Sequence, residues 1–173
     1  AVKPSGTVSQ LVDSASGIHP RYSSQYIRRV RADARDPLCA VLEAAGVPVE
    51  EDVMSATTKV FSFPIKSPEG AVVASEMGAM EQLELWEIYQ DYWCEHKPSM
   101  TCYYRDEEFL EVGQWLYNKF DKISGVSFLP YSEHTYQQAP YEPIDLETYE
   151  KLKKEFPETI DWAISENSDM TEG

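Results

Sequence analysis

Apolar residues at helical spacing predict four helices of useful length along the chain. The clearest spans residues 36–46, because Asp36 is a favourable N-cap, Pro37 suits the first helical position and Gly46 suits the end. The others are predicted at residues 75–94, at residues 106–122 and from Asp145 to the residue before Pro157.

Two of these helices carry apolar side chains that we expect to lie in the core. The helix at residues 75–94 has a stripe of methionine and aromatic residues, made of Met77, Met80, Leu83, Ile88, Tyr89, Tyr92 and Trp93. The helix at residues 106–122 has Phe109, Val112, Leu116 and Phe120 on one side. Stripes of this kind belong to a core far more often than to a cofactor site.

Alternation of apolar and polar residues predicts four strands, at residues 26–31, 57–65, 98–104 and 124–130. Pro64 predicts that the second is an edge strand, because proline has no N–H to donate to a neighbouring strand. The fourth reads as a short buried strand that stops at a proline. Residues 136–143 are punctuated by prolines and are predicted to form a loop.

The third and fourth strands flank a helix, and a strand–helix–strand unit of this spacing predicts two parallel strands. The sequence therefore predicts an α/β fold. Ligands in such folds meet the carboxyl ends of the strands. One such end holds Tyr103 and Tyr104, and the next holds Pro130, Tyr131 and His134, so Pro130 and Tyr131 are candidates for a pocket.

Length and composition suggest how the chain is divided. The 173 residues, 42% of them hydrophobic, suffice for one domain over residues 1–141, followed by an acidic helix and tail over residues 142–173. No apolar run approaches the ~20 residues of a membrane-spanning helix, and no basic-then-apolar leader precedes the first turn, so we expect a soluble cytoplasmic protein. The cysteines show no metal-binding spacing, and we expect buried, reduced thiols.

The charge distribution favours a small phosphorylated ligand over a polymer. The net charge is −15, which disfavours binding to nucleic acid or to an anionic membrane. Residues 1–35 nevertheless carry six basic side chains against two acidic ones, while residues 36–173 carry a net charge of −19. The positive charge is therefore local and accompanies the first turn of the chain.

That first turn is the main candidate for a binding site. It consists of Pro4, Ser5, Gly6, Thr7, Val8 and Ser9 and leads into a short helix over residues 8–13. The first N–H groups of a helix have no partner within it, Gly6 permits a close approach, and three hydroxyl groups add donors, which together suit a phosphate. The alternative is an ordinary capped helix start.

Two basic side chains that follow the turn, His19 and Arg21, are further candidates for the pocket. For His19 the alternative is a loop histidine that bonds to the backbone. Beyond these residues no motif identifies a reaction, since the chain has no Walker loop, no H-E-x-x-H and no Ser/His/Asp grouping. Residue chemistry therefore predicts an α/β protein that binds a small phosphorylated ligand.

Seven blocks of the sequence, taken in order, extend this prediction. They are residues 2–12 (VKPSGTVSQLV), 16–22 (SGIHPRY), 26–31 (YIRRVR), 45–48 (AGVP), 63–70 (FPIKSPEG), 127–130 (SFLP) and 136–141 (YQQAPY). Together they resemble the carboxy-terminal part of adenosylcobalamin-dependent (class II) ribonucleotide reductases. The resemblance spans nearly the whole chain, and several blocks in order are more specific than any one of them.

The resemblance implies part of a ten-stranded α/β barrel, in which the strands at residues 98–104 and 124–130 would be among the last. Enzymes of this family reduce ribonucleoside di- or triphosphates to deoxyribonucleotides, for DNA replication, through a cysteine thiyl radical that adenosylcobalamin initiates. The resemblance also implies that the turn at residues 4–9 holds the substrate phosphates and that a thioredoxin-type protein supplies electrons.

The resemblance also implies that parts of the enzyme lie outside this sequence. The family's radical cysteine, its asparagine and glutamate neighbours and its reducing cysteine pair lie upstream of the phosphate turn, and Cys39, Cys94 and Cys102 match none of them. We therefore expect no catalytic residue and no metal ligand here, and an upstream half that brings the radical and most cofactor contacts.

The origin of the chain and its exact role stay open at this point. The sequence would suit a fragment of a longer polypeptide, a split-gene subunit or a segment that follows an intein. The alternative function is a non-catalytic nucleotide-binding or assembly subunit of the same fold.

Overall fold

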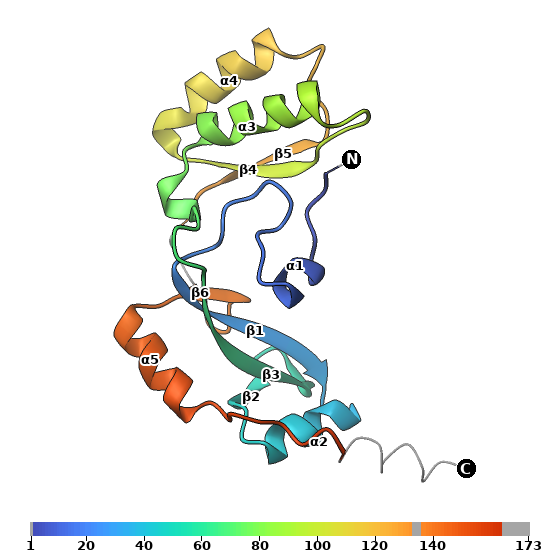
Figure 1. The fold of residues 1–173 in the computed structure, drawn as a ribbon, viewed down its shortest axis with the longest axis vertical. Coiled ribbons are helices and arrows are strands. Elements are labelled where there is room, and N and C mark those ends of the chain that lie inside the picture. Colours follow the sequence, from blue (N-terminus) through green and yellow to red (C-terminus); the bar gives the residue numbers. More distant parts are fainter. Residues whose placement is uncertain (1, 133–135, 164–173) are drawn as a thin grey trace, which may run out of the picture. The chain divides into compact units, whose positions relative to one another are not determined.

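The computed structural model describes residues 2–132 and 136–163, so His134 and the end of the chain lie outside the described residues. The chain forms two units (Figure 1). The first comprises residues 1–24 and 67–134, and the second comprises residues 25–66 and 135–173. Each unit has its own sheet and its own hydrophobic core.

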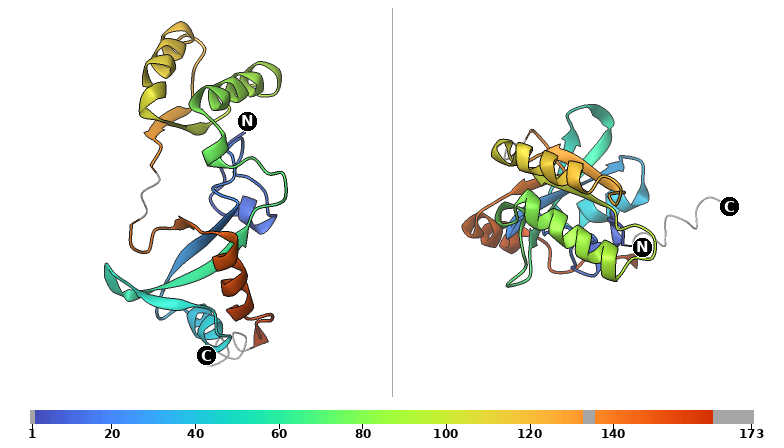
Figure 2. Two further views of the ribbon diagram at one scale, coloured as in Figure 1. Left: turned by 90° about the vertical axis from the view of Figure 1, so that its left-hand side faces the viewer. Right: turned by 90° about the horizontal axis from the view of Figure 1, so that it is seen from above.

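The first unit is built on two parallel strands, which confirms the strand–helix–strand prediction. Strand β4 (Met100–Tyr104) pairs with β5 (Val126–Pro130) in the register Met100↔Val126. Helices α3 (Ala79–Tyr92) and α4 (Phe109–Asn118) lie side by side on one face of this sheet (Figure 2). The short α1 (Val8–Leu11) and the 3₁₀ turns η1 (Ala74–Glu76) and η2 (Asp106–Glu108) complete the unit.

The core of the first unit lies between the two helices and β4. Leu83 and Trp86 of α3 are fully buried, as are Met100 and Cys102 of β4. The ring of Trp86 meets the edge of Trp115 from α4 at a centroid distance of 6.2 Å. The indole N–H of Trp86 donates to the carbonyl of Pro98, so the largest buried side chain also has its polar atom satisfied.

Several side chains predicted for this core are on the surface instead. Ile88, Tyr92 and Trp93 of the α3 stripe are exposed, as are Phe109 at the start of α4 and Phe120 just after its end. The buried side of α3 runs through Ala79, Gln82, Leu83 and Trp86, so the predicted stripe combined residues from two sides of the helix. Strand β5 was predicted to be buried, but Leu129 is half exposed, because β5 has a strand neighbour on one side alone within the described residues.

The second unit contains a four-stranded antiparallel sheet in the order β2-β3-β1-β6. The strands are β1 (Gln25–Asp33), β2 (Val49–Asp52), β3 (Ser55–Lys66) and β6 (Tyr141–Pro143). Strand β3 is therefore interior, and the edge-strand prediction from Pro64 is wrong. Pro64 is tolerated because β2 pairs with β3 only as far as Phe61, which leaves one strand neighbour beside the proline.

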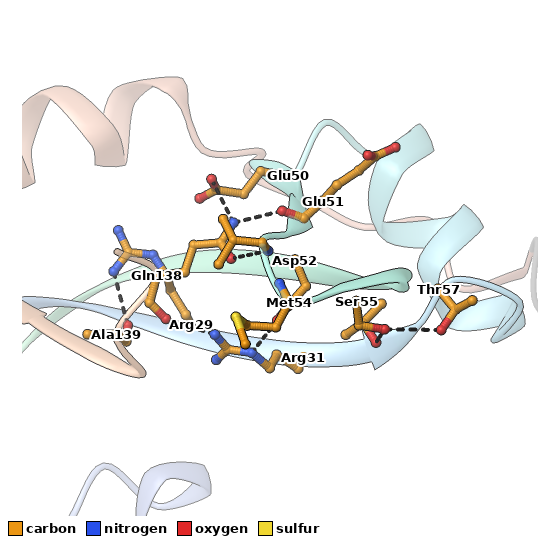
Figure 3. Close-up of polar contacts among 12 residues, drawn as sticks. Arg29, Arg31, Glu50, Glu51, Asp52, Met54, Ser55, Thr57, Gln138 and Ala139 are labelled. Atoms are coloured by element: carbon orange, nitrogen blue, oxygen red, sulfur yellow. Dashed lines mark hydrogen bonds and ion pairs between the residues drawn. The ribbon is translucent and has the colours of Figure 1, made fainter. Parts of the chain in front are cut away.

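The two faces of this sheet differ in character, as alternation along the strands requires. One face packs against α2 (Pro37–Ala44) and α5 (Leu146–Glu155), with Cys39, Leu42, Val47 and Phe61 in the core. Asp36 and Asp145 cap these helices by accepting from the backbone N–H groups of Leu38 and Thr148, as predicted for helix starts. The other face is polar and carries arginine and carboxylate side chains (Figure 3).

Candidate functional site

The turn at residues 4–9 is held in place by a pair of serines. The backbone N–H of Ser5 donates to Ser16 Oγ at 2.8 Å, and Ser16 Oγ donates back to the carbonyl of Ser5 at 2.9 Å. Ser5 Oγ in turn accepts from the backbone N–H of Ser9 at 3.3 Å. Ser5 and Ser16 are thus structural residues, which fix the shape of the turn.

Gly17 allows the segment around Lys3 and the segment around Ser16 to lie close together. Its φ is +62°, and a Cβ at this position would lie 2.8 Å from the carbonyl oxygen of Lys3. Any other residue would push the segment that leads into the turn away from Ser16. The glycine therefore belongs to the construction of the turn, although it lies eight residues after Ser9.

The turn presents several hydrogen-bond donors that have no partner among the described residues. The backbone N–H groups of Gly6, Thr7 and Val8 make no hydrogen bond there, and Thr7 does not cap α1 with its side chain. Ser9 is 6% exposed, and its buried hydroxyl also lacks a partner. Gly6, Thr7 and Val8 are exposed, so their N–H groups are open to a ligand at the start of the helix, and such groups suit a bound anion with several oxygens.

His19 serves the fold through both of its ring nitrogens. Nε2 accepts from the backbone N–H of Thr101 at 2.9 Å, so this nitrogen carries no proton. Nδ1 therefore carries the proton and donates to the carbonyl of Ser16 at 2.7 Å. His19 connects the loop to β4, as the alternative of a loop histidine bonded to the backbone predicts.

The outer edge of β4, which faces away from β5, is covered along its length by partners that are not strands. The backbone N–H of Ser99 donates to the carbonyl of Val2 at 2.8 Å, and that of Tyr103 donates to Gln82 Oε1 at 3.1 Å. With His19 on Thr101, every second N–H along this edge has a partner that is not a strand. No sequence pattern indicates this role, because the partners are far apart along the chain.

Arg21 is also engaged within the protein. Its side chain is 5% exposed, and its guanidinium donates to Asp13 Oδ1 at 2.9 Å, to the carbonyl of Ser14 at 3.0 Å and to Ser67 Oγ at 3.2 Å. Each of its three nitrogens therefore has a partner. Arg21 fixes the chain that follows α1, and its charge is balanced by Asp13.

Pro130 and Tyr131 lie at the carboxyl end of β5, as predicted. The backbone N–H of Tyr131 donates to the carbonyl of Tyr104 at 2.7 Å, and the guanidinium of Arg105 lies 4.7 Å from the centre of the Tyr131 ring. Within residues 2–132, no hydrogen bond or ion pair joins Pro130 or Tyr131 to the turn. Their place in a pocket stays a prediction.

Comparisons with known proteins identify relatives of this chain in sequence and in structure. No protein-family model matches it. It is 36% identical over 98% of its length to an adenosylcobalamin-dependent ribonucleoside-triphosphate reductase of Lactobacillus delbrueckii subsp. bulgaricus. It is also 36% identical over 88% of its length to a probable enzyme of the same name from Dictyostelium discoideum. A crystal structure of a B12-dependent (class II) ribonucleotide reductase superposes on 99% of the chain with a TM-score of 0.86 and 32% identity.

The chain belongs to the adenosylcobalamin-dependent ribonucleotide reductase family. It spans 24% of the Lactobacillus relative, 21% of the Dictyostelium relative and 24% of the chain in the crystal structure. The structural match extends over both units and confirms the α/β fold of the chain.

The three cysteines of the chain are all buried. Burial, with a further contribution from Glu108, raises the pKa of the Cys102 thiol to about 12, and burial also raises the pKa of Cys39. Thiols of this kind hold very little thiolate at neutral pH. Across the described residues, no group of three or more histidine, cysteine or acidic side chains is arranged to hold a metal ion. Within the same ranges, no helix is long and apolar enough to cross a lipid bilayer.

Proposed function

We propose that this chain is the part of a ribonucleotide reductase that holds the phosphates of a ribonucleoside di- or triphosphate. The observation that carries the proposal is the turn at residues 4–9, where three backbone N–H groups and the buried Ser9 hydroxyl have no partner among the described residues. Phosphate oxygens accept from such donors. The relatives are named as ribonucleoside-triphosphate reductases, which supports a nucleotide as the ligand.

The sheet of the first unit supports the proposal that this chain is part of a larger protein. A sheet of two parallel strands is marginally stable on its own, and parallel strands are normally buried inside larger sheets. The outer edge of β4 is closed by Val2, His19 and Gln82, whereas β5 has no second strand neighbour within the described residues. We infer that the sheet continues from β5 into the rest of a ten-stranded barrel.

The radical chemistry belongs to the rest of the reductase in this proposal. Adenosylcobalamin, when bound to the whole enzyme, supplies the radical that activates a cysteine thiol. The thiols of this chain do not fit that role, because all three are buried inside the protein. The residues of this chain bind and orient the substrate, and a thioredoxin-type protein would return electrons to cysteines located elsewhere.

The test is substrate affinity in the complete reductase that carries this sequence. Thr7→Leu places a bulky apolar side chain among the donors of the turn, and Ser9→Ala removes the buried hydroxyl. We expect either change to raise the KM for the ribonucleotide about 10- to 100-fold, the value of one or two hydrogen bonds to a charged group. Leu11→Ala is the matched control, because Leu11 is 86% exposed at the end of α1.

An unchanged KM in both variants would show that the turn does not hold the substrate. The alternative, a non-catalytic nucleotide-binding or assembly subunit, is separated by co-expressing the chain with the rest of the reductase. Restored cobalamin-dependent reduction supports the enzyme, whereas nucleotide binding without reduction supports the alternative.

A further inference from the structure

A continuous series of hydrogen bonds joins the start of the phosphate turn to strand β4 through His19. The hydroxyl of Ser16 bonds to both backbone groups of Ser5, at 2.8 and 2.9 Å. The carbonyl of the same Ser16 accepts from His19 twice, from Nδ1 at 2.7 Å and from the backbone N–H at 3.1 Å. The series ends at the backbone N–H of Thr101, which donates to His19 Nε2 at 2.9 Å.

The end of the turn is held separately, by Arg21. The backbone N–H of Ser14 donates to the carbonyl of Ser9 at 2.8 Å, and the carbonyl of Ser14 accepts from Arg21 Nη1 at 3.0 Å. Arg21 is in turn bonded to Ser67 Oγ through Nε and to the carbonyl of Val72 through its backbone N–H. A change at His19 therefore loosens the start of the turn while its end stays attached.

The donors that the turn offers to a ligand lie between these two attachments. They are the backbone N–H groups of residues 6–8, which have no partner among the described residues. Their directions depend on the backbone conformation of the turn, which Ser5 fixes at one end and Ser9 at the other. A site that has one conformation before binding gains affinity, because little ordering remains to be done when the ligand arrives.

We propose that His19 is a positioning residue for the substrate phosphates and acts through Ser16 on the conformation of the turn. This role rests on the proposed function of the turn. Both ring nitrogens of His19 are used within the protein, so the side chain acts behind the turn and not on the ligand. Loss of its bond to Ser16 should weaken phosphate binding more than loss of its bond to β4. The segment that leads into the turn has a second bond to β4, from Ser99 N–H to the carbonyl of Val2.

The two nitrogens of His19 can be tested one at a time. The amide N–H of asparagine can replace Nδ1–H, and the amide oxygen of glutamine can replace Nε2. His19→Gln therefore keeps the acceptor for Thr101 and loses the donor to Ser16, whereas His19→Asn does the opposite. Each variant gives up one hydrogen bond of the fold, so we expect similar unfolding temperatures. A difference in ligand affinity between them reports on the turn.

The measurement is equilibrium binding of cytidine triphosphate to the complete reductase that carries this sequence, without adenosylcobalamin. We expect His19→Gln to weaken binding about 10-fold and His19→Asn less than about 3-fold. Ser16→Ala removes both bonds to Ser5 and should also weaken binding about 10-fold, whereas Ser16→Thr keeps a hydroxyl and should restore most of the affinity.

Gln82→Leu is the matched control for the edge of β4. The side chain of Gln82 bonds to Gly78 and Tyr103, so its loss leaves the N–H of Tyr103 without its acceptor but does not touch the turn. We expect unchanged binding of cytidine triphosphate. A loss of affinity as large as that of His19→Gln would mean that any damage to this edge weakens binding, and it would overturn the positioning role.

Equal affinities of His19→Asn and His19→Gln, or wild-type affinity of Ser16→Ala, would also overturn it. Thr7→Leu separates this failure from failure of the proposed function. If Thr7→Leu weakens binding and the variants of His19 and Ser16 bind like the wild type, the turn holds the phosphates without their help. If Thr7→Leu has no effect, the turn is not the phosphate site and both proposals are wrong.

Discussion

Gln138 is the residue on which the loop before β6 depends. It is 4% exposed and adopts a φ of +57°, which is uncommon for a residue other than glycine. Its side chain satisfies the backbone N–H of Val53 and the carbonyl of Glu51, which are both in the β2–β3 hairpin. We expect Gln138→Ala to lower the free energy of unfolding by about 2–3 kcal/mol, because it leaves these groups unsatisfied.

Urea unfolding followed by circular dichroism measures this loss. The neighbouring Gln137 is exposed, and Gln137→Ala should change the free energy of unfolding by less than about 0.5 kcal/mol. Similar losses in the two variants would mean that the network around Gln138 contributes nothing specific to stability.

At the scale of single residues, the sequence predicted local chemistry and missed distant partners. The donors of the turn could be predicted, because a proline, a glycine and three hydroxyl groups in seven positions determine them locally. His19 and Arg21 were predicted as pocket residues because they follow the turn in the sequence. Their bonds, however, reach Thr101 and Ser67, which lie 82 and 46 residues away. No pattern within a short window could indicate that His19 closes the edge of a strand.

The contact between α3 and α4 includes an ion-pair network that links stability to pH. Glu87 Oε1 lies 2.6 Å from Lys119 Nζ and 2.8 Å from Lys122 Nζ, and Lys122 also pairs with Asp91 at 2.6 Å. Hydrogen bonds from Lys119 and Lys122 lower the pKa of Glu87, while Asp91 and Glu87 raise the pKa of Lys122. The contribution of Glu87 is therefore present above its unfolded pKa of about 4.3 and is lost as the pH falls through the lower folded value.

We expect Glu87→Gln to lower the free energy of unfolding by less than about 1 kcal/mol at pH 7, since the network is partly exposed. The difference from the wild type should shrink as the pH falls through the lowered folded pKa of Glu87, and it should disappear once Glu87 is protonated in both states. The stability that Lys122 contributes has the opposite pH dependence, because it is lost only as the pH rises through the raised folded pKa of Lys122. Chemical unfolding at several pH values tests this, with the exposed Glu84→Gln on α3 as the control. A difference that stays the same from pH 7 down to the acid end of the series would contradict it.

At the scale of elements, the strands that sequence reasoning missed are those with polar or proline-rich sequences. Strand β2 reads Val-Glu-Glu-Asp, and β6 reads Tyr-Glu-Pro, so neither shows an apolar alternation. Both lie at the ends of the sheet order, where one side has no strand neighbour among the described residues. Strands β1 and β3, which form the middle of the sheet, show the alternation and were predicted.

At the scale of the whole molecule, the α/β class followed from the strand–helix–strand unit, whereas the split into two units did not. The first unit is interrupted by residues 25–66, which form most of the second. The pattern of hydrophobic and polar residues predicts elements one after another along the chain. It does not indicate that two distant segments belong to one unit while the segment between them belongs to another. The prediction of one domain relied on chain length and hydrophobic content, and that of an acidic tail relied on charge. None of these quantities indicates which segments pack together.

The exposed apolar residues of the first unit lead to a prediction about the isolated chain. Leu110, Tyr117 and Phe120 are 82%, 85% and 76% exposed, and they follow one another at helical spacing on or just after α4. Exposed apolar groups of this kind mark surfaces that other protein covers. The relatives are about four times as long as the chain, so the rest of a reductase is the natural cover in our proposal. We therefore expect residues 1–173 alone to bind the dye ANS at pH 7.

The comparison that decides this is ANS fluorescence of the chain alone against that of the complete reductase at equal molar concentration. We expect the isolated chain to give the stronger signal, although the reductase is larger, and Leu110→Ser with Tyr117→Ser to reduce it. The isolated chain should stay in solution during the measurement, because its net charge of −15 opposes association. A signal from the isolated chain no greater than that of the reductase would mean that these residues stay exposed in the whole enzyme. The continuation of the sheet beyond β5 would then need separate support.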